Sequence, residues 1–590
     1  MQGNAADYDV AVVGGGPLGL AYATWLKQDR PETRIVVLEK RAAPGFKIGE
    51  STLVPTVSSV LSLGPTAAAM RRLFHPKFGL WFWWMGPDSQ SIEAQVDPGN
   101  FDETFQLERR VFETMLMRVA ERNGVEIRRD TRVDIANSTL GAGASELACE
   151  TSSGESSRVR ARLVCDASGP ASIIPRALGL HRQNTDFTTN AYWAYFRKKS
   201  QIDFDGWDVT ATRHLCFPEG WVWFIELVSW EDAPDENLKA MVDYLLDLPE
   251  DAPDYPTRQE LSERFDCPYE QVIESIGVVP RTDIDSASGL PAEERFDHYV
   301  HKYPAFKKIM DTYELVEEPY KGLPTHFAYS ELVHYSERYA GDGWLAVGDA
   351  AFFVNPFLSP GLTYGFPTSS LAAKESAGAL ESGDVSAAAF AHYDETVRAT
   401  YEALVAEHEM FYRCFRHPLS YEKPFLTKAG LGVLSGRFAH VLELLGGPGG
   451  HRMPNRRLPG PVGGPGSVVD PRYLDVVHRI IETTKEDEEQ GVDPGVTAEK
   501  VEAIVEPFLD QARSMEGFGD LHVGRAFEKF DDDFRRVAHK EDWQPLIPRW
   551  RCPNCRNDAP AAFDTCYVCG ESRPGSEAAA TGSAAAERAR

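Results

Sequence analysis

The stretch YDVAVVGGGPLGLAYATWLKQ, residues 8–28, decides the fold of the N-terminal part of the chain. A short apolar strand pattern runs into Gly14-x-Gly16-x-x-Gly19, and a helical pattern of apolar residues follows. In such a unit the first glycine permits a tight turn, the second lets the backbone approach a pyrophosphate, and the third allows close packing of the helix on the strand. The N–H groups that begin the helix can bind phosphate oxygens. The stretch therefore predicts a Rossmann-type dinucleotide site.

A second strand and an acidic residue strengthen this prediction. The sequence RIVVLEK, residues 34–40, contains Glu39 twenty residues after Gly19. A carboxylate at this distance can accept hydrogen bonds from the ribose hydroxyls of a dinucleotide. A glycine-rich turn without any ligand is the alternative, but the strand, helix and acid together favour adenine dinucleotide binding.

Length and charge limit the possible functions. A chain of 590 residues is expected to form about two to four domains. A formal charge of −28 argues against a nucleic-acid partner or an anionic membrane surface, since both require basic patches. No apolar run is long enough for a membrane span. The glycine loop at Gly14 leaves no room for a signal peptide before it, so we expect a cytoplasmic protein.

A later motif decides between FAD and NAD as the dinucleotide. The segment GDGWLAVGDAAFFVNPFLSPGLTYGF, residues 341–366, contains a strand that delivers Gly348 and Asp349 to a turn, and a helix that starts near Gly361. An aspartate in such a turn can accept a hydrogen bond from a ribityl hydroxyl. The N-terminus of the following helix can face the pyrimidine side of a flavin.

Two further elements lie between the glycine loop and this turn. A predicted helix carries Arg109, and RLVCDASGP, residues 162–170, is a strand that runs into Asp166. These elements in this order resemble the FAD enzymes that are built like aromatic hydroxylases. The resemblance covers roughly residues 7–415 and implies FAD as the cofactor, with Arg109 and Asp166 among its contacts.

Within that class the chain resembles the flavin-dependent halogenase family. Four stretches carry the resemblance, and they occur in the family's order: IGESTLVP (48–55), PKFGLWFWW (76–84), GWVWFIEL (220–227) and GDAAFFVNPFLSPG (348–361). They look like the Gly-Glu-Ser segment beside the flavin ring, the strand with the catalytic lysine, the Trp-x-Trp-x-Ile signature, and the Gly-Asp-Ala-Ala segment with its Pro-x-x-Ser-x-Gly turn.

The resemblance implies a two-stage reaction. Reduced FAD, oxygen and a halide give hypohalous acid, which travels through an internal tunnel to Lys77 and halogenates an electron-rich substrate. An ammonium group can polarise hypohalous acid, and a partly desolvated amine can form a chloramine. Trp221 and Trp223 are implied to separate the substrate from the flavin, and Glu50 to belong to the catalytic group. The turn with Ser359, Pro360 and Gly361 is implied to bind the halide.

The sequence departs from the family pattern at several positions. Leu358 stands where tryptophan-specific members carry a glutamate, and an apolar residue here is closer to the phenol- and pyrrole-type members. Pro360 stands where serine or threonine is usual and removes one backbone N–H from the halide turn. Glu226 replaces the usual proline after Trp-x-Trp-x-Ile. These departures keep a second hypothesis open, an FAD-dependent monooxygenase or flavin-linked reductase that does not halogenate.

Each candidate residue also has an ordinary structural explanation. Lys77 and Glu50 can be exposed surface charges. Trp221 and Trp223 can be ordinary sheet aromatics, and Arg109 can be the partner of an ion pair along its helix. Asp349 can be a simple turn residue.

The implied partners follow from the same resemblance. No second Gly-x-Gly-x-x-Gly is visible for NAD(P)H, so reduced FAD is expected from a separate NAD(P)H:flavin reductase. The substrate is expected to be a small molecule, either free or bound to a carrier.

The C-terminal region contains Cys552-x-x-Cys555 and, after ten residues, Cys566-x-x-Cys569. Two CxxC turns at this separation predict a four-cysteine structural Zn²⁺ site, in which four thiolates leave no open position on the metal. A segment this short cannot build a core, so metal binding must supply its folding energy. Iron in a rubredoxin-like site is the alternative. A ribbon that serves only to dock partners, on a flavoprotein without enzymatic activity, is the non-enzyme hypothesis.

The predicted fold class is α/β. It combines a Rossmann-type FAD-binding fold with an antiparallel sheet on the substrate side, a C-terminal helical region and a small zinc ribbon. The predicted parts are 1–183 (Rossmann-type FAD-binding part), 184–335 (substrate-side sheet), 336–445 (second FAD-binding part and helices), 446–546 (Gly/Pro linker and acidic helical region), 547–573 (zinc ribbon) and 574–590 (disordered tail).

Overall fold

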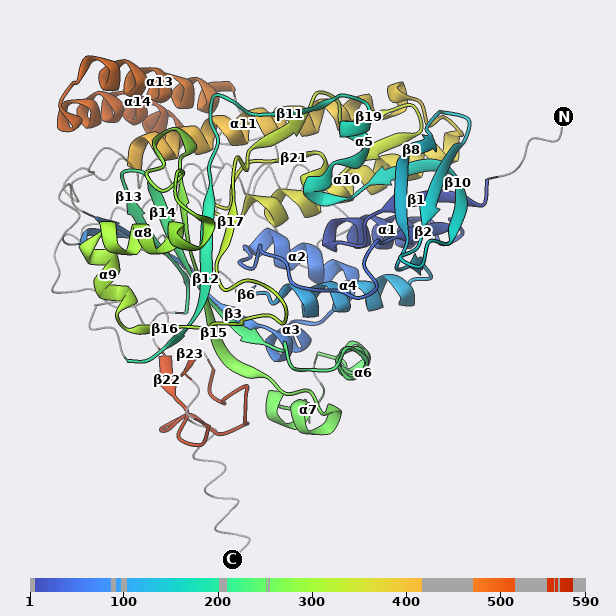
Figure 1. Ribbon diagram of the computed structural model, residues 1–590, viewed down its shortest axis with the longest axis horizontal. Coiled ribbons are helices and arrows are strands. Elements are labelled where there is room, and N and C mark those ends of the chain that lie inside the picture. Colours follow the sequence, from blue (N-terminus) through green and yellow to red (C-terminus); the bar gives the residue numbers. More distant parts are fainter. Residues whose placement is uncertain are drawn as a thin grey trace, which may run out of the picture.

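The computed structural model describes residues 6–85, 92–96, 103–200, 210–250, 252, 255–415, 471–514, 549–555, 558–560 and 563–576. Much of the predicted linker and acidic region, residues 446–470 and 515–546, lies outside the described residues, as does most of the predicted tail. Two sheets dominate the described part, and the helices between them connect the two (Figure 1).

The first sheet is the Rossmann-type sheet predicted from the glycine loop. Its strands follow the order β19 (Ala340–Gly341), β20 (Trp344–Ala346), β10 (Ser156–Asp166), β1 (Tyr8–Val13), β2 (Ile35–Leu38) and β7 (Glu126–Arg128), and the hairpin of β8 (Arg132–Thr139) and β9 (Ser145–Glu150) joins it at β10. The pairings from β20 to β7 are all parallel. Strand β19 pairs antiparallel with β20, and β9 pairs antiparallel with β10. Strands β1 and β2 are almost wholly buried, which is typical of a parallel sheet covered on both faces.

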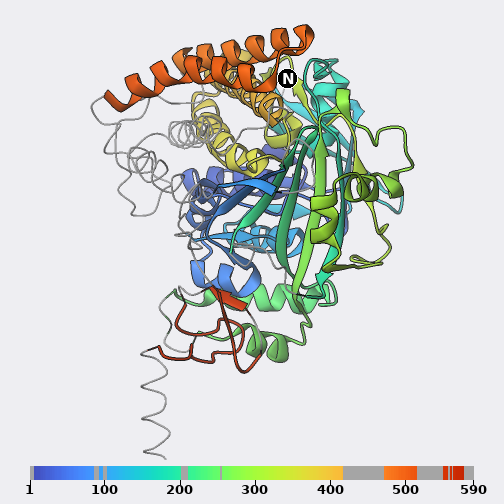
Figure 2. The same cartoon turned by 90° about the vertical axis from the view of Figure 1, so that its left-hand side faces the viewer.

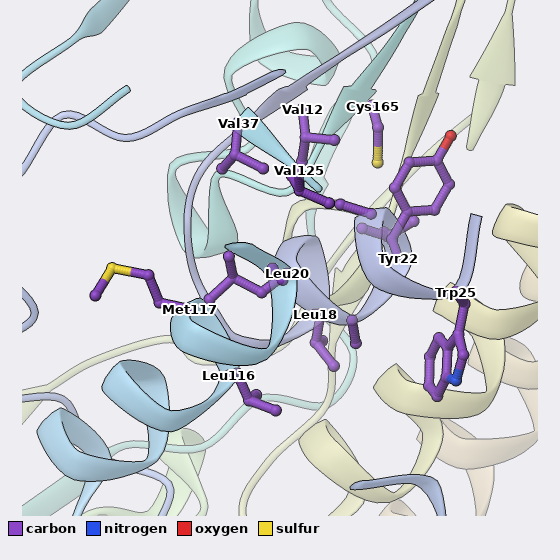
Figure 3. Packing of buried hydrophobic residues seen from close by; sticks show 14 of the residues in the cluster. Val12, Leu18, Leu20, Tyr22, Trp25, Val37, Leu116, Met117, Val125 and Cys165 are labelled. Atoms are coloured by element: carbon purple, nitrogen blue, oxygen red, sulfur yellow. The ribbon is translucent and has the colours of Figure 1, made fainter. Parts of the chain in front are cut away.

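Helix α1 (Pro17–Asp29) fixes the glycine loop against this sheet. Figure 3 shows Leu18 and Leu20 of α1 in one core with Leu116 and Met117 of α4 (Arg109–Arg122) and with Val12 and Val37 of the sheet. The glycines are required by close approach: a Cβ at Gly14 (φ +110°) would lie 2.3 Å from the carbonyl oxygen of Ala167. A Cβ at Gly19 would lie 2.5 Å from the carbonyl oxygen of Gly14. Only glycine therefore permits this packing.

The second sheet is built mostly from the middle of the chain. Its order is β16 (Tyr313–Leu315), β12 (Ala191–Lys198), β15 (Glu270–Pro280), β14 (Gly220–Ser229), β13 (Thr212–Phe217), β4 (Leu80–Met85) and β5 (Ile92–Val96), with β17 (Phe327–Tyr329) also paired to β12. Strands β4 and β5 come from the part that the sequence assigned to FAD binding, so the predicted boundary at residue 183 divides this sheet. The sheet was expected to be antiparallel, but β13 and β4 pair in parallel.

Alternation along the strands gives the second sheet two different faces. Trp81 and Trp83 point to the outer face, where they share a core with residues of α8 (Arg295–Lys302) and α9 (Pro304–Met310). Phe82 points to the inner face and shares a core there with Trp221, Trp223 and Ile225. The aromatic residues of β4 are therefore divided between the core of the outer face and the inner face, which faces the FAD-binding part.

Long helices close the inner face. Helix α10 (Pro360–Ser382) packs along α1, and α11 (Ala391–Phe415) follows it. The antiparallel pair α13 (Pro471–Gln490) and α14 (Pro494–Ser514) covers α11 (Figure 1). None of the helices in the described ranges combines the length and hydrophobicity that crossing a membrane would require.

Shorter elements connect these layers. They are α2 (Val54–Leu63), α3 (Ala67–Leu73), β3 (His75–Lys77), β6 (Thr104–Gln106), α5 (Ile173–Ala177), β11 (His181–Gln183), α6 (Asp235–Asp247), α7 (Arg258–Phe265), β18 (His334–Ser336), β21 (Phe352–Phe353), β22 (Arg549–Arg551) and β23 (Asp558–Pro560), with 3-10 turns at Gly169–Ala171, Thr282–Ile284, Ala292–Glu294, Gly348–Ala350 and Ala387–Phe390. Strands β22 and β23, together with the four-cysteine segments around them, form the C-terminal ribbon. The ribbon lies at the end of the molecule that holds α7 (Figure 2).

Candidate active site

The glycine loop and Glu39 form a cradle for the adenosine side of a dinucleotide. The Glu39 side chain is buried, and its two oxygens accept the N–H groups of Gly15 (2.7 Å) and Arg41 (2.8 Å). These bonds hold the carboxylate at the end of β2, where a ribose is expected. At Gly16 an added Cβ would meet only the amine of Lys47, at 3.8 Å, so the backbone there is open to an approaching phosphate.

Asp166 ends β10 and binds the backbone beside the glycine loop. Its carboxylate is fully buried and accepts the N–H groups of Ser168 (2.9 Å) and Ile174 (2.7 Å). One oxygen therefore binds the loop that follows β10 and the other binds the first turn of α5, and the loop carries Ala167 against Gly14. These contacts assign Asp166 to shaping the glycine loop, and direct contact with the cofactor stays a prediction.

The Asp349 turn meets the start of α10 at a small cleft. The cleft is lined by Gly348, Asp349, Phe352, Phe353, Val354, Pro360, Gly361, Tyr364, Gly365 and Thr368. Burial raises the pKa of the Asp349 carboxyl, while His334, Arg109 and Lys47 oppose this effect. The Asp349 turn, predicted to bind the ribityl chain, and the helix N-terminus, predicted to face the flavin pyrimidine, therefore line the same cleft.

Arg109 lies at the start of α4 and forms the helix ion pair that was its structural explanation, while a contact with the flavin stays a prediction. Its guanidinium donates to the carbonyl oxygen of Ile48 (2.7 Å) and forms an ion pair with Glu113 (2.9 Å) one turn further along the helix. Glu113 also pairs with Lys47 (2.7 Å), so one buried carboxylate holds two cations near the glycine loop. Sequence analysis missed Lys47 and Glu113, because neither residue stands in a recognised motif.

The predicted halide turn has an unusual backbone. Leu358 (φ +59°) and Ser359 (φ +54°) are both left-handed, which is costly for residues with a Cβ. The surroundings hold this conformation: Asn355 accepts the N–H of Phe357 (2.8 Å), and His408 lies 3.1 Å from the Phe357 carbonyl oxygen. Sequence analysis missed His408, which comes from the middle of α11.

Pro360 is the first residue of α10. A helix leaves its first N–H groups without intrahelical acceptors, so proline at this position costs the helix no hydrogen bond. The N–H groups of Gly361 and Leu362 follow it in the first turn. The turn therefore keeps backbone donors at a positive helix end, even though the proline supplies none.

Lys77 is completely buried, at 0% exposure, which excludes its alternative explanation as a solvated surface lysine. It ends β3, which pairs with β6 through Thr104. Its ammonium nitrogen donates to the hydroxyl of Ser51 (2.8 Å) and to the carbonyl oxygen of Thr52 (2.6 Å). The loss of hydration lowers the pKa of the amine to about 7. Lys77 is thus joined directly to the Gly-Glu-Ser segment.

A histidine that sequence analysis missed lies close to this lysine. His214 of β13 is buried, bonds the carbonyl oxygen of Trp81 (3.0 Å) and stacks on Phe82 with ring centroids 4.5 Å apart. Burial lowers the pKa of His214 to about 3, and the charge of Lys77 acts in the same direction. His214 is therefore a neutral imidazole. In the sequence it is one of three polar residues at the start of a short strand, TRHLCF, and nothing there singles it out.

Glu50 is also buried, at 3% exposure, so the explanation as a surface acid is excluded. One oxygen accepts a hydrogen bond from the Tyr195 hydroxyl (2.7 Å). Burial raises the pKa of the Glu50 carboxyl to about 7, although Tyr195, Ser275 and Arg109 lower it in part. Glu50 and Lys77, which flank the Ser51–Thr52 pair in space, are thus both poised to titrate near neutrality.

Trp221 and Trp223 lie on the inner face and are fixed by hydrogen bonds. The indole N–H of Trp221 donates to the Tyr412 hydroxyl of α11 (2.7 Å), and that of Trp223 donates to the Ser275 hydroxyl (3.0 Å). Their rings are 6.0 Å apart, and the Trp221 ring lies 5.1 Å from Phe357 of the halide turn. The two hydrogen-bonded rings therefore cover the inner face of β14 where it meets that turn.

The four cysteines of the ribbon come together. The Sγ atoms of Cys552, Cys555, Cys566 and Cys569 all lie within 4.8 Å of one another. Thiolates gathered in this way fit a tetrahedral metal such as Zn²⁺. The ribbon also packs against Tyr269, which directly precedes β15 of the second sheet.

Comparison with known proteins identifies an FAD-binding domain and related halogenases. A family model described as an FAD binding domain matches residues 7–266. The flavin-dependent halogenase malA of Malbranchea aurantiaca is 33% identical over 440 residues, which cover 69% of this chain and 66% of that protein. The chain thus spans just under two thirds of the length of malA. A 1H-pyrrole-2-carbonyl-[peptidyl-carrier protein] chlorinase of Pseudomonas fluorescens is 23% identical, with 66% of this chain and 80% of that protein covered.

Solved structures agree on the fold. Halogenase PltM in complex with phloroglucinol and FAD superposes with a TM-score of 0.62 at 17% identity, covering 85% of this chain and 96% of that one. At this identity the likeness establishes the fold alone. The FAD-binding domain, the shared fold and the relationship to malA lead to one conclusion. The chain belongs to the flavin-dependent halogenase family.

Proposed function

We propose that this protein is an FAD-dependent halogenase that acts on an electron-rich, phenol- or pyrrole-type substrate, either free or bound to a carrier. The observation that carries the proposal is the completely buried amine of Lys77, which bonds Ser51 and Thr52 of the Gly-Glu-Ser segment. A lysine is seldom buried without a function, because removing its charge from water is costly.

The residues of the cradle fit FAD. The open backbone at Gly16 suits the pyrophosphate, Glu39 suits the adenosine ribose, and Asp349 with the start of α10 suits the ribityl chain and the flavin pyrimidine. When bound in reduced form, FAD supplies electrons to oxygen, so that FADH₂, O₂, halide and a proton give FAD, hypohalous acid and water. Lys47 and Arg109, both held by Glu113, would balance the negative charge of the cofactor.

The role of Lys77 follows from its protonation. With a pKa of about 7, the amine is substantially protonated at neutral pH. The Nζ–H group can then donate a hydrogen bond to the oxygen of hypohalous acid and make the halogen more electrophilic. The substrate carbon attacks the halogen, the halogen–oxygen bond breaks, and Nζ gives its proton to the departing hydroxide, which leaves as water. The substrate loses a proton in turn, so the halogen replaces one hydrogen.

The substrate class rests on the turn at Leu358. This side chain is buried at 2% exposure within the apolar core of the inner face. No carboxylate occupies the position, so Lys77 would have to polarise the oxidant without the glutamate that stands there in tryptophan-specific members. A substrate that is strongly activated by its own hydroxyl or ring nitrogen suits a site of this kind.

Two further parts of the proposal concern metal and electrons. We assign structural Zn²⁺ to the four cysteines, on the strength of their converging thiols. Reduced FAD would come from a separate NAD(P)H:flavin reductase, because the sequence carries one dinucleotide fingerprint.

The test combines the protein with FAD, NADH, a generic flavin reductase, oxygen, bromide and a chromogenic phenol that traps electrophilic bromine. Wild type is compared with Lys77→Met, and Lys302→Met on the outer side of the sheet is the matched control. We expect Lys77→Met to lower bromination about 10²–10⁴-fold, the range for loss of a proton-donating group. Oxidation of reduced flavin should be unchanged in both variants.

Other outcomes separate the hypotheses. A wild type that hydroxylates the phenol and incorporates no bromine would identify a monooxygenase. Bromination that persists in Lys77→Met would remove the lysine from the reaction.

A further inference from the structure

The C-terminal ribbon packs directly beside the lysine strand, although nearly 500 residues separate them in the sequence. The ring of Phe563 meets the ring of Phe78 edge-on, with centroids 5.8 Å apart. Phe78 follows Lys77 immediately and is buried at 8% exposure. Its N–H donates to the carbonyl oxygen of Thr210, next to the strand that carries His214. The ribbon therefore covers the end of β3 at the residue adjacent to Lys77.

A second contact of Phe563 is with Arg71, whose ion pair leads to the start of β6. The guanidinium of Arg71 lies over the Phe563 ring, 5.9 Å from its centroid, and pairs with Glu103 at 2.7 Å. Glu103 precedes Thr104, the residue of β6 that pairs with Lys77. Phe563 thus contacts Phe78 at the end of β3 and Arg71, whose ion-pair partner Glu103 directly precedes β6.

A third contact uses Arg258, which is fully buried at the start of α7. Its side chain donates to the carbonyl oxygens of Arg71 (3.0 Å), Arg72 (2.7 Å) and Phe74 (2.8 Å), which end α3 just before β3 begins. The ring of Tyr567, from the ribbon, lies 5.1 Å from the Arg258 guanidinium.

The backbone of α7 completes this junction. The N–H of Gln259 donates to the carbonyl oxygen of Val568 (3.0 Å), so the ribbon accepts an N–H of the first turn of α7 in addition to the capping box of Thr257 and Glu260. Both Tyr567 and Val568 lie between Cys566 and Cys569. The segment that carries one pair of metal ligands is therefore the segment that docks on α7.

From these contacts we propose that the four-cysteine ribbon is a brace that keeps Lys77 enclosed, with Phe563 as its positioning residue. The inference rests on the proposed function for the role of Lys77 and for the metal. Metal binding orders the Cys566–Cys569 loop, this loop docks on α7, and the docked ribbon presses Phe563 onto Phe78. Loss of the metal or of the Phe563 ring opens the end of β3 and admits water to the lysine.

The experiment measures how accessible the Lys77 amine is. Native full-length protein is labelled briefly with an amine-reactive reagent, and the peptide that contains Lys77 is quantified by mass spectrometry. Phe563→Ala is compared with wild type, with the conservative Phe563→Tyr, and with Asp564→Asn. The last is the matched control, because Asp564 pairs only within the ribbon, with Arg573 (3.0 Å) among the described residues.

Phe563→Ala should raise Lys77 labelling about two- to tenfold, the range that the loss of one aromatic contact allows. Phe563→Tyr and Asp564→Asn should resemble wild type. Removing the metal with a chelator should raise labelling in wild type to a similar extent and add little in Phe563→Ala, because both changes break the same contact. FAD binding, measured by flavin fluorescence, should stay the same in every variant and show that the fold is intact.

The proposal is overturned if labelling of Lys77 rises neither in Phe563→Ala nor after chelation. It is also overturned if the two treatments add fully, because they would then act through separate contacts. Labelling requires no halogenation, so a protein that fails to brominate can still confirm the brace, and an active halogenase can still refute it.

Discussion

The amine of Lys77 loses its water of hydration on folding, and this sets its pKa to about 7. If the protonated amine polarises the oxidant, the transfer of halogen should be fastest below pH 7. The yield of brominated phenol per reduced FAD consumed should then fall about tenfold per pH unit well above pH 7. A yield that rises through this range would identify the neutral amine as the working form, acting through a chloramine.

The same burial has a consequence for stability. The unfolded lysine keeps its proton up to about pH 10.4, whereas the folded amine loses it near pH 7. Between these values the unfolded state binds more protons, so raising the pH favours folding and relieves the cost of burying the charge. Lys77→Met should therefore raise the free energy of unfolding, and the gain should shrink as the pH increases from 7 to 10. Urea titrations at the two pH values measure this, and a gain that is equal at both would show that the amine is not desolvated.

The second sheet contains one buried and one exposed arginine ion pair, and their contributions to stability can be compared directly. Arg213 of β13 is 0% exposed and pairs with Glu274 (2.5 Å) and Glu226 (3.2 Å). Arg197 of β12 pairs with Glu270 at 2.5 Å, but its side chain is 52% exposed. Arg213→Leu should lower the free energy of unfolding by about 3–5 kcal/mol, because it leaves Glu274 buried without its cation.

Arg197→Leu is the control for this comparison and should cost at most about 1 kcal/mol, because solvent already screens its ion pair. Denaturant unfolding of both variants gives the two values. Equal effects would mean that burial does not determine what these ion pairs contribute. Glu226, which replaces the family's proline, has a structural explanation in this cluster.

The start of α10 allows a prediction about halide binding. Pro360 is the first residue of the helix and has no N–H, so Pro360→Ser would add one donor at the positive helix end. The KM for bromide should fall about two- to tenfold, the contribution of one typical added hydrogen bond. Pro304→Ser, at the corresponding position of α9, is the matched control. A KM unchanged by Pro360→Ser would place the halide elsewhere.

What the sequence could predict depends on how local each element is. The cradle of Gly14, Gly16 and Glu39 was predictable because strand, turn and helix are adjacent in the chain. The division of Trp81 and Phe82 between two faces follows from alternation, yet which face meets the flavin depends on the parallel pairing of β4 with β13, over 130 residues away. His214 reaches Lys77 only through that pairing, so no local pattern could identify it.

At the scale of the whole molecule, the C-terminal ribbon returns to the N-terminal third of the chain and packs beside Lys77. The ribbon touches α3, α7 and Phe78, whereas the FAD cradle lies in the other sheet. Deleting residues 546–590 should therefore reduce kcat for bromination and lower the Tm, because Phe78 and Arg258 lose their cover, but should leave the affinity for FAD unchanged.

The two effects distinguish an integral brace from a tethered docking module. A module that only recruits a reductase would leave the Tm unchanged, and its loss would be bypassed by supplying chemically reduced FAD. Because the proposed brace acts on Lys77 itself, reduced FAD should not restore bromination in the truncated protein. Thermal unfolding together with bromination driven by photoreduced FAD decides between them, and full rescue at an unchanged Tm would reduce the ribbon to a docking site.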